Sequence, residues 1–282
     1  MVENRPWLNI ATHLVLILGT AIVLFPVWVA FMASTYTGVE IDQGAMPLLP
    51  GGSLIDNYRL ILGEGASREG LPPVGPMLVN SLVMALCIAI GKIVISLLSA
   101  FAIVYFRFPL RNLAFWMIFI TLMLPVEVRI VPTYQVIADL GMLNSYAGLT
   151  IPLIASATAT FLYRQLFLTI PDELAEAARV DGAGPWKFFK DILIPLSRTN
   201  TAALFVILFI YGWNQYLWPL LVTTRPDYYT VVMGIQRLTS AAQDQPVWHL
   251  AMGTATLAML PPVVVVLVMQ RLFVKGLVET EK

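Results

Sequence analysis

Residues 78–106 read LVNSLVMALCIAIGKIVISLLSAFAIVYF, an apolar run that contains one charged residue, Lys92. A helix that crosses the ~30 Å hydrocarbon layer of a membrane needs about 20 such residues. In lipid, every backbone N–H and C=O must find a partner within its own segment or within a closed barrel. The run does not alternate between apolar and polar residues, as a barrel strand does, so it predicts a transmembrane helix.

Five further stretches have the same character, and together they predict an all-α membrane protein with six transmembrane helices. The predicted spans are Thr12–Ser34, Leu78–Phe106, Leu113–Val131, Ala147–Leu168, Asn200–Val222 and Val247–Gln270. The first is too long for the apolar part of a cleavable signal, so we expect it to remain as a membrane anchor. The composition agrees, because 12% of the residues are charged against about 25% in soluble domains.

The positive charges predict the orientation of these spans. If the N-terminus is cytoplasmic, eleven Lys and Arg residues lie inside and five lie outside, while Lys92 falls within a span. Cytoplasmic loops carry the excess of Lys and Arg, so both termini are expected inside. On this topology residues 1–76 hold an N-terminal segment, the first span and an outside loop. Residues 77–271 form a core of five spans, and residues 272–282 form a cytoplasmic tail.

The composition argues against several function classes. The net charge is zero and no basic run occurs, so no nucleic-acid partner is indicated. One cysteine and two distant histidines predict neither a disulfide framework nor a metal site. No phosphate-binding loop is present, because Gly91-Lys92 is followed by Ile93 instead of Ser or Thr. We therefore expect no catalytic residue, no metal and no cofactor in this chain.

One inside loop, residues 169–199, carries the functional argument. It reads TIPDELAEAARVDGAGPWKFFKDILIPLSRT and predicts two short helices around a turn. Pro171 and the acidic residues after it suit a helix start, and Gly182 suits a helix end. The second helix begins at Gly184-Pro185 and ends at Pro195. A short helix outside the membrane either lies in the interface or docks into a partner.

Docking is the favoured interpretation of the first helix. Small residues permit close approach of another backbone; they are Ala175, Ala177, Ala178 and Ala183. Glu176, Arg179 and Asp181 can fix the register with charges on a partner. A helix that lies flat in the interface would show more Lys and Arg on its polar side.

The spacing of this loop resembles the EAA loop of binding-protein-dependent ABC importer permeases. The residues that carry the resemblance are Glu176, Ala177, Ala178, Asp181, Gly182, Ala183, Ile192 and Pro195. The chain departs from the family pattern at Ile194, where Leu is usual. The resemblance implies a type I ABC importer permease fold with both termini inside. It also implies that the loop contains a coupling helix, which seats in the cleft of a cytoplasmic ATPase subunit.

Other segments extend the resemblance. Residues 143–146 and 213–219 are similar to the maltose-permease-like carbohydrate branch, and residues 3–7, 102–112 and 124–130 to permeases of bacterial sn-glycerol-3-phosphate importers. This implies a non-catalytic subunit that moves sn-glycerol-3-phosphate across the bacterial inner membrane. The implied partners are a companion permease that completes a heterodimer, two copies of an ABC ATPase that binds ATP and Mg²⁺, a periplasmic solute-binding protein and membrane lipid.

Polar residues inside the spans are candidates for the substrate path. Arg129 either binds an anionic phosphate ester or pairs with loop or lipid groups at the outer interface, and the neighbouring Glu127 would repel a phosphate. Lys92 either lines the cavity or pairs with an acidic residue of the companion permease. Asn80, Asn214 and Gln215 either bond substrate hydroxyls in the pore or join helices to one another.

Several alternatives to sn-glycerol-3-phosphate import stay open on the sequence, and the first is another glycerol-derived solute in the same class of importer. A neutral sugar gains support if neither Arg129 nor Lys92 faces the cavity. A secondary transporter is disfavoured, because such folds usually show internal repeats and acidic residues in mid-span. An intramembrane enzyme is disfavoured further, since no paired His, Asp or Ser/His constellation lies within the spans.

Overall fold

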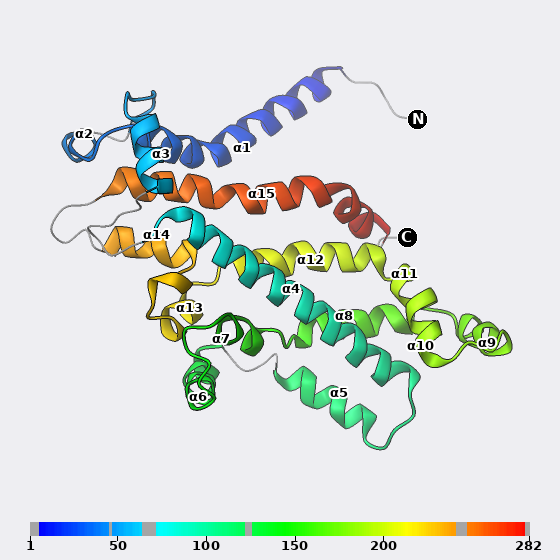
Figure 1. Ribbon diagram of the computed structural model, residues 1–282. Helices are drawn as coiled ribbons and strands as arrows, with labels where there is room; N and C mark the ends of the chain where they lie inside the picture. Colours follow the sequence, from blue (N-terminus) through cyan, green and yellow to red (C-terminus); the bar gives the residue numbers. More distant parts are fainter. Residues whose placement is uncertain (1–5, 45–46, 64–71, 122–125, 241–246, 280–282) are drawn as a thin grey trace. The chain divides into compact units, whose positions relative to one another are not determined.

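The computed structural model describes residues 6–44, 47–63, 72–121, 126–240 and 247–279 (Figure 1). Within these ranges the regular structure is entirely helical and contains no strand, which confirms the all-α prediction. The chain divides into two compact units. The first consists of residues 1–77 and 231–260, and the second consists of residues 78–230 and 261–282.

Three helices are long and apolar enough to cross a membrane on their own. They are α1 (Pro6–Ala33), α4 (Val74–Tyr105) and the apolar part, Trp248–Gln270, of α15 (Trp248–Glu279). They correspond to the first, second and sixth predicted spans. Their ends differ from the predicted ends by a few residues, because end positions depend on capping contacts that hydropathy does not record.

The other three predicted spans are not continuous helices, which corrects the sequence-based boundaries. The third is divided into α5 (Arg111–Ile120) and α6 (Val126–Asp139). Residues 122–125 lie outside the described residues, and so does the side chain of Glu127. The fourth contains α7 (Tyr146–Thr150), the 3₁₀ turn η3 (Ile151–Leu153) and α8 (Ala157–Leu168), with a bend of 48°. The fifth contains α12 (Arg198–Trp213) and α13 (Leu217–Val222).

Side chains satisfy the backbone at these breaks. Pro152 lacks an N–H and interrupts the fourth span, and Ser156 then starts α8 by accepting from the N–H of Ala159 at 3.3 Å. At the end of α12, the amide of Gln215 donates to the carbonyl of Tyr211 at 3.0 Å. Helix ends leave such groups without an intrahelical partner, and in lipid they must be paired by the protein.

The first unit contains an ordered polar segment after α1. Its helices are α1, α2 (Gly38–Gln43), α3 (Leu54–Gly63), α14 (Val231–Ser240) and the first part of α15. Asn57 of α3 is buried and donates to the carbonyls of Ser34 at 2.9 Å and Tyr36 at 2.7 Å. The outside loop after α1 therefore contains the helices α2 and α3, and a buried amide joins α3 to the end of α1.

The core of the second unit forms where helices approach closely at glycines. Its buried side chains are Met84, Ile88, Ile137, Leu149, Trp218 and Val222. The indole of Trp218 donates to the carbonyl of Gly148 at 3.0 Å, so its one polar atom is satisfied. A Cβ at Gly148 would overlap the carbonyl of Met142, and a Cβ at Gly212 would lie 2.9 Å from the Cα of Ala85. Close packing leaves no room for a side chain at either position.

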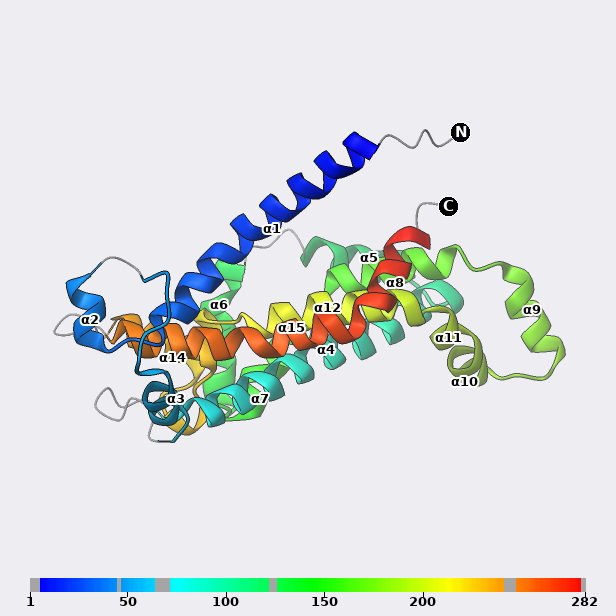
Figure 2. The ribbon, with the colours of Figure 1, turned by 90° about the horizontal axis from the view of Figure 1, so that it is seen from above.

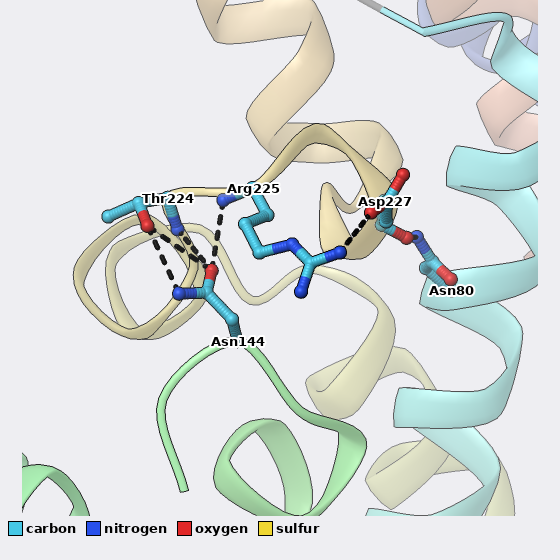
Figure 3. Close-up of polar contacts among 5 residues, drawn as sticks. All are labelled: Asn80, Asn144, Thr224, Arg225 and Asp227. Carbon is cyan, nitrogen blue, oxygen red and sulfur yellow. Dashed lines mark hydrogen bonds and ion pairs between the residues drawn. The ribbon is translucent and has the colours of Figure 1, made fainter. Parts of the chain in front are cut away.

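A polar network fixes the turn after α6 to the loop after α13 (Figure 3). Asn144 has the left-handed φ of 53°. Its side-chain oxygen accepts from the N–H groups of Thr224 at 2.7 Å and Arg225 at 2.9 Å. Arg225 also pairs with Asp227 at 2.9 Å, in the short 3₁₀ turn η5 (Pro226–Tyr228). The two loops are therefore held together by this amide side chain and by the backbone N–H of Asn144, which donates to the carbonyl of Val222 at 2.9 Å.

Asn80 of α4 extends the same network inward (Figure 3). It is buried and donates to the carbonyls of Asp227 at 2.8 Å and Tyr229 at 3.0 Å. Its side-chain oxygen accepts from the hydroxyl of Tyr146 at 2.6 Å. This amide joins α4 to α7 and to the loop before α14. Of the two roles that the sequence leaves open for Asn80, the structure places it in the helix-joining one.

The polar network and the loop 169–199 lie at opposite ends of the second unit. In both views α9 (Asp172–Val180) and α10 (Pro185–Phe188) form one end, while α6 and α7 lie toward the other (Figures 1 and 2). The charge distribution predicts that the end with α9 faces the cytoplasm. The network of Asn144 then faces the outer compartment.

Replacing Gly148 with Ala should destabilise the protein, because the new methyl group would overlap the carbonyl of Met142. Overpacking of this kind costs about 1–3 kcal/mol. We expect a lower thermal unfolding midpoint in detergent. The matched control is Gly75→Ala, since a Cβ at Gly75 meets nothing within 4 Å. Equal midpoints for Gly148→Ala and the unaltered protein would contradict this packing.

Replacing Asn144 with Gly should loosen the outer loops, because glycine keeps the left-handed backbone and removes only the side-chain amide. The hydrogen bonds lost are worth about 1 kcal/mol each, so the N–H groups of Thr224 and Arg225 should exchange with deuterium about tenfold faster. Asn144→Asp retains the acceptor oxygen and should preserve protection. If the amides of the Gly and Asp variants exchange at the same rate, the side-chain oxygen of residue 144 is not what protects them.

Candidate functional site

The inside loop forms the nine-residue helix α9, as the sequence predicts. Pro171, predicted as the first helical residue, immediately precedes it and fixes the entering backbone. Asp172 and Glu173 lie in the first turn, where the helix dipole favours negative charge, and Arg179 lies in the last turn. Local sequence therefore accounts for this helix without support from the membrane.

Gly182 ends α9 in the left-handed conformation that the sequence predicts, with φ of 70°. Its N–H donates to the carbonyl of Arg179 at 3.0 Å, and the N–H of Ala183 donates to the carbonyl of Ala178 at 2.8 Å. This pair of bonds is a Schellman motif, which satisfies the last carbonyls of a helix. A Cβ at Gly182 would meet nothing within 4 Å, so glycine is required there for its backbone conformation and not for space.

One face of α9 packs against the C-terminal end of α4. Ala178 is 5% exposed, while Ala175 and Ala183 are half-buried. They line a hollow of about 270 Å³, which we call the aromatic hollow, together with Phe101, Tyr105, Phe106, Arg107, Arg179, Pro185 and Phe188. This corrects the interpretation that all four alanines meet a partner, because three of them face this chain's own α4.

The opposite face of α9, which we call the outer face, consists of Glu176, Ala177, Val180 and Asp181. All four residues are exposed, and Val180 is 87% exposed. An exposed valine on a helix that is already anchored by its other face contributes nothing to the stability of this chain. The outer face thus leaves one branched apolar side chain and two carboxylates accessible to a partner.

A second helix connects α9 to α12 and contains a wide turn. It consists of α10, the π turn η4 (Phe189–Leu193) and α11 (Ile194–Leu196). Pro195 has no N–H to donate to the carbonyl of Asp191, four residues earlier, and a π turn accommodates this defect. The helix ends at Leu196, one residue beyond the predicted end, and the chain then bends by 72° into α12. Ile192 is half-buried and Pro195 is exposed.

Aromatic rings join this second helix to the membrane-spanning helices. The ring centroids of Phe188 and Tyr105 lie 5.1 Å apart, and those of Phe189 and Phe101 lie 4.8 Å apart. The hydroxyl of Tyr105 donates to the carbonyl of Phe167 on α8 at 3.4 Å. Aromatic pairs contribute about 0.5–1.5 kcal/mol each beyond their area burial. The second helix of the loop is therefore packed onto α4, and α4 is in turn bonded to α8.

A second hollow of about 390 Å³, which we call the polar hollow, lies among helices of the second unit. It is lined by Lys92, Ile95, Ser99, Ile118, Thr121, Arg129, Ala155, Ser156, Ala157, Thr158, Thr160 and Tyr211. Two predicted substrate-path residues, Lys92 and Arg129, meet here. Lys92 is 8% exposed, and its ammonium nitrogen lies 4.0 Å from the centroid of the Tyr211 ring.

The other three predicted substrate-path residues do not line the polar hollow. Asn80 lies in the network described above, the side chain of Gln215 caps α12, and Asn214 is exposed just after that helix. Sequence reasoning missed Tyr211, which offered one signal: a phenol inside an otherwise apolar span. It also missed Ser99, which only the packing of α4 against α8 brings to the site.

The side chains that line the polar hollow suit the binding of a small polar solute. Its lining offers two cations, a phenol and several hydroxyls, and no carboxylate, histidine or cysteine is among the described residues that line it. Among the described residues, no group of three or more His, Cys, Asp or Glu could hold a metal ion. The hollow can therefore donate hydrogen bonds to a small anionic or hydroxylated solute.

Curated relatives agree over the full length of the chain. The sn-glycerol-3-phosphate transport system permease protein UgpE of Brucella melitensis biotype 1 is 59% identical over 282 residues, which is all of both chains. The proteins of the same name from Escherichia coli O1:K1 and Rhizobium meliloti are each 60% identical over the same length. The relatives are permease subunits, which are non-catalytic transport components.

Solved structures and the family comparison agree with these relatives. The fold is similar, with a TM-score of 0.77 and 19% identity, to a chain in the crystal structure of a bacterial ABC transporter involved in the import of the acidic polysaccharide alginate. The match covers 96% of this chain and 98% of that chain. Residues 92–279 match the family described as binding-protein-dependent transport system inner membrane component. The chain therefore belongs to this family of inner-membrane permease subunits.

Proposed function

We propose that this protein is one of two permease subunits of an ATP-driven importer of sn-glycerol-3-phosphate. The substrate is supported by the permeases of that name, which are about 60% identical over the whole chain. The polar hollow adds independent support, because Lys92 and Arg129 both line it. A neutral sugar is less well supported for the same reason, since two cations in a solute path favour an anion.

The observation that carries the mechanism is the two-sided packing of α9. Its inner face is seated in the aromatic hollow, while its outer face is free and presents Val180 at 87% exposure. On the predicted orientation this outer face lies in the cytoplasm. The occupant that we propose for it is the groove of a cytoplasmic ATPase subunit, which also holds the ATP and Mg²⁺ of the cycle.

The complete importer would contain a companion permease, two copies of that ATPase and a periplasmic solute-binding protein. The ATPase can shift the permease between inward-open and outward-open states only if it binds the two states with different free energies. If α9 were joined to the spans by a flexible segment, α9 could move with the ATPase while the spans stayed in place. The rings of Phe188, Phe189 and Tyr105 instead fasten the loop to α4, so closure of the ATPase dimer moves the spans.

Uptake of the solute tests the proposed function directly. Proteoliposomes that contain the complete importer, with ATP inside and the binding protein outside, should accumulate sn-glycerol-3-phosphate. We expect maltose, as a neutral sugar of the related branch, not to be accumulated. Accumulation of the sugar without the phosphate ester would contradict the assigned substrate while leaving the transport class intact.

Gly182→Val should uncouple transport, because a β-branched residue is strained at φ of 70°. We expect uptake to fall at least about tenfold, which corresponds to roughly 1.4 kcal/mol or more, while membrane insertion is retained. Gly182→Asn is the matched control, since Asn tolerates the left-handed conformation at a helix end, and it should retain most of the uptake. Full uptake by the Val variant would count against α9 as the coupling element.

Val180→Asp should weaken assembly with the ATPase, because a charge would replace the one apolar anchor of the outer face. Co-purification of the ATPase with the permeases in mild detergent should drop about tenfold or more. Val180→Leu keeps the apolar character and should retain the partner. The thermal stability of the isolated chain should be the same in all three proteins, since Val180 is exposed. Undiminished co-purification of the Asp variant would place the docking surface elsewhere.

A further inference from the structure

Within the described part of the chain, the two cations of the polar hollow have no acidic partner. Lys92 lies in the middle of α4 and is buried, at 8% exposure, whereas Arg129 lies on α6 and is exposed, so the cost of burial falls on Lys92. The lining includes no carboxylate, and neither cation forms an ion pair within the described part of the chain. A buried charge without a partner is costly, and inside a membrane it is retained where it has a function.

The contact between Lys92 and Tyr211 only partly compensates this cost. The ammonium nitrogen lies 4.0 Å from the ring centroid, a distance at which the ring face attracts a cation. A cation–π contact is weaker than a charge-assisted hydrogen bond to an anion. The ring can therefore hold the ammonium group in place and release it to a stronger acceptor.

Hydroxyl groups beside the cations extend the site. Ser99 and Thr158 line the hollow, and their hydroxyls have no hydrogen-bond partner within the described residues. Thr160 is already engaged, since its hydroxyl donates to the carbonyl of Ser156 at 2.9 Å. The site thus combines two cations with free hydroxyl donors on neighbouring helices.

We propose that the polar hollow is an anion subsite that binds the phosphate group of a small phosphate monoester during its passage. Arg129 would bind the phosphate oxygens with its guanidinium fork, and Lys92 would contribute a point charge. Ser99 and Thr158 would bond hydroxyls of the esterified alcohol. This inference rests on the proposed function and deepens it, because it assigns substrate contact to this permease subunit.

Charge and size both favour this ligand. A phosphate monoester carries about −1.5 to −2 charges at pH 7, which matches two cations, whereas a carboxylate carries one. The volume of about 390 Å³ lies within the ~300–1,000 Å³ of typical ligand pockets. A lipid head group offers the same phosphate chemistry, so the experiment must separate it from the soluble ester.

The reaction rates of anionic and cationic thiol reagents report the electrostatic potential of this hollow in the complete importer. The chain has one cysteine, Cys87, so Ala155→Cys in a Cys87→Ser background places a single thiol on the hollow's lining. We expect the anionic sulfonatoethyl methanethiosulfonate to react at least about tenfold faster than its trimethylammonium counterpart, because a cationic cleft concentrates anions. Adding Lys92→Met and Arg129→Gln should abolish this preference.

Protection by solutes identifies the ligand. Added sn-glycerol-3-phosphate should slow the labelling at residue 155, and glycerol should not. Labelling that responds to the phosphatidylglycerol content of the vesicles, and not to the soluble ester, would assign the site to lipid and overturn the proposal. Equal reaction with both reagents, or no reaction with either during ATP turnover, would also overturn it.

Uptake separates this inference from the function on which it rests. Arg129→Gln and Lys92→Met should each lower uptake of sn-glycerol-3-phosphate about tenfold, and Lys92→Arg should restore part of it. Arg59→Gln is the matched control, since Arg59 is an exposed cation on α3 of the first unit. Normal uptake by both hollow variants would refute the subsite alone. Failure of the unaltered importer to take up the ester would refute the proposed function.

Discussion

The free energy lost when a polar group goes unpaired in lipid is the constraint on which the rest of this structure depends. A continuous apolar helix without an internal proline meets the constraint by itself, as in α4. Where a span is broken, side chains must bond the backbone groups that the helix end leaves unpaired. Ser156 and Gln215 make such hydrogen bonds. The same reasoning applies to Lys92. Its buried ammonium group contacts an aromatic ring, which is a weaker partner than an anion. The breaks in the spans and the proposed solute site are therefore both explained by one physical cost.

The coupling loop meets a different requirement, that of stiffness. A nine-residue helix in water is marginal on its own, yet α9 is fixed at one end by its Schellman motif and along one face by the aromatic hollow. The helix that follows it is packed by ring contacts onto α4. Because α4 also carries Lys92, one rigid helix connects the docking loop to the polar hollow. A motion imposed on α9 can thus change the surroundings of a bound solute.

Much of this architecture could be predicted from local sequence, and the failures have physical causes. The start of α9 and the left-handed Gly182 follow from capping rules that act over a few residues. Hydropathy averaged over a whole span does not record the breaks in the fourth and fifth predicted spans, although Pro152 and the polar pair Asn214-Gln215 lie beside them in the sequence. The inward direction of Ala175, Ala178 and Ala183 required knowledge of where α4 ends in space. The pairing of Lys92 with Tyr211 joins residues 119 positions apart, and no local pattern records such a contact.

The central claim is that a separate ATPase subunit binds the outer face of α9. Site-directed disulfide cross-linking in the assembled importer tests it most directly, with single cysteines introduced as Val180→Cys and Ala178→Cys in a Cys87→Ser background. Each would be paired with cysteines along the groove of the ATPase. The account predicts that residue 180 cross-links efficiently and that residue 178, which is 5% exposed, does not. A cross-link at residue 178 without one at residue 180, or labelling of residue 180 from the outer compartment, would contradict it.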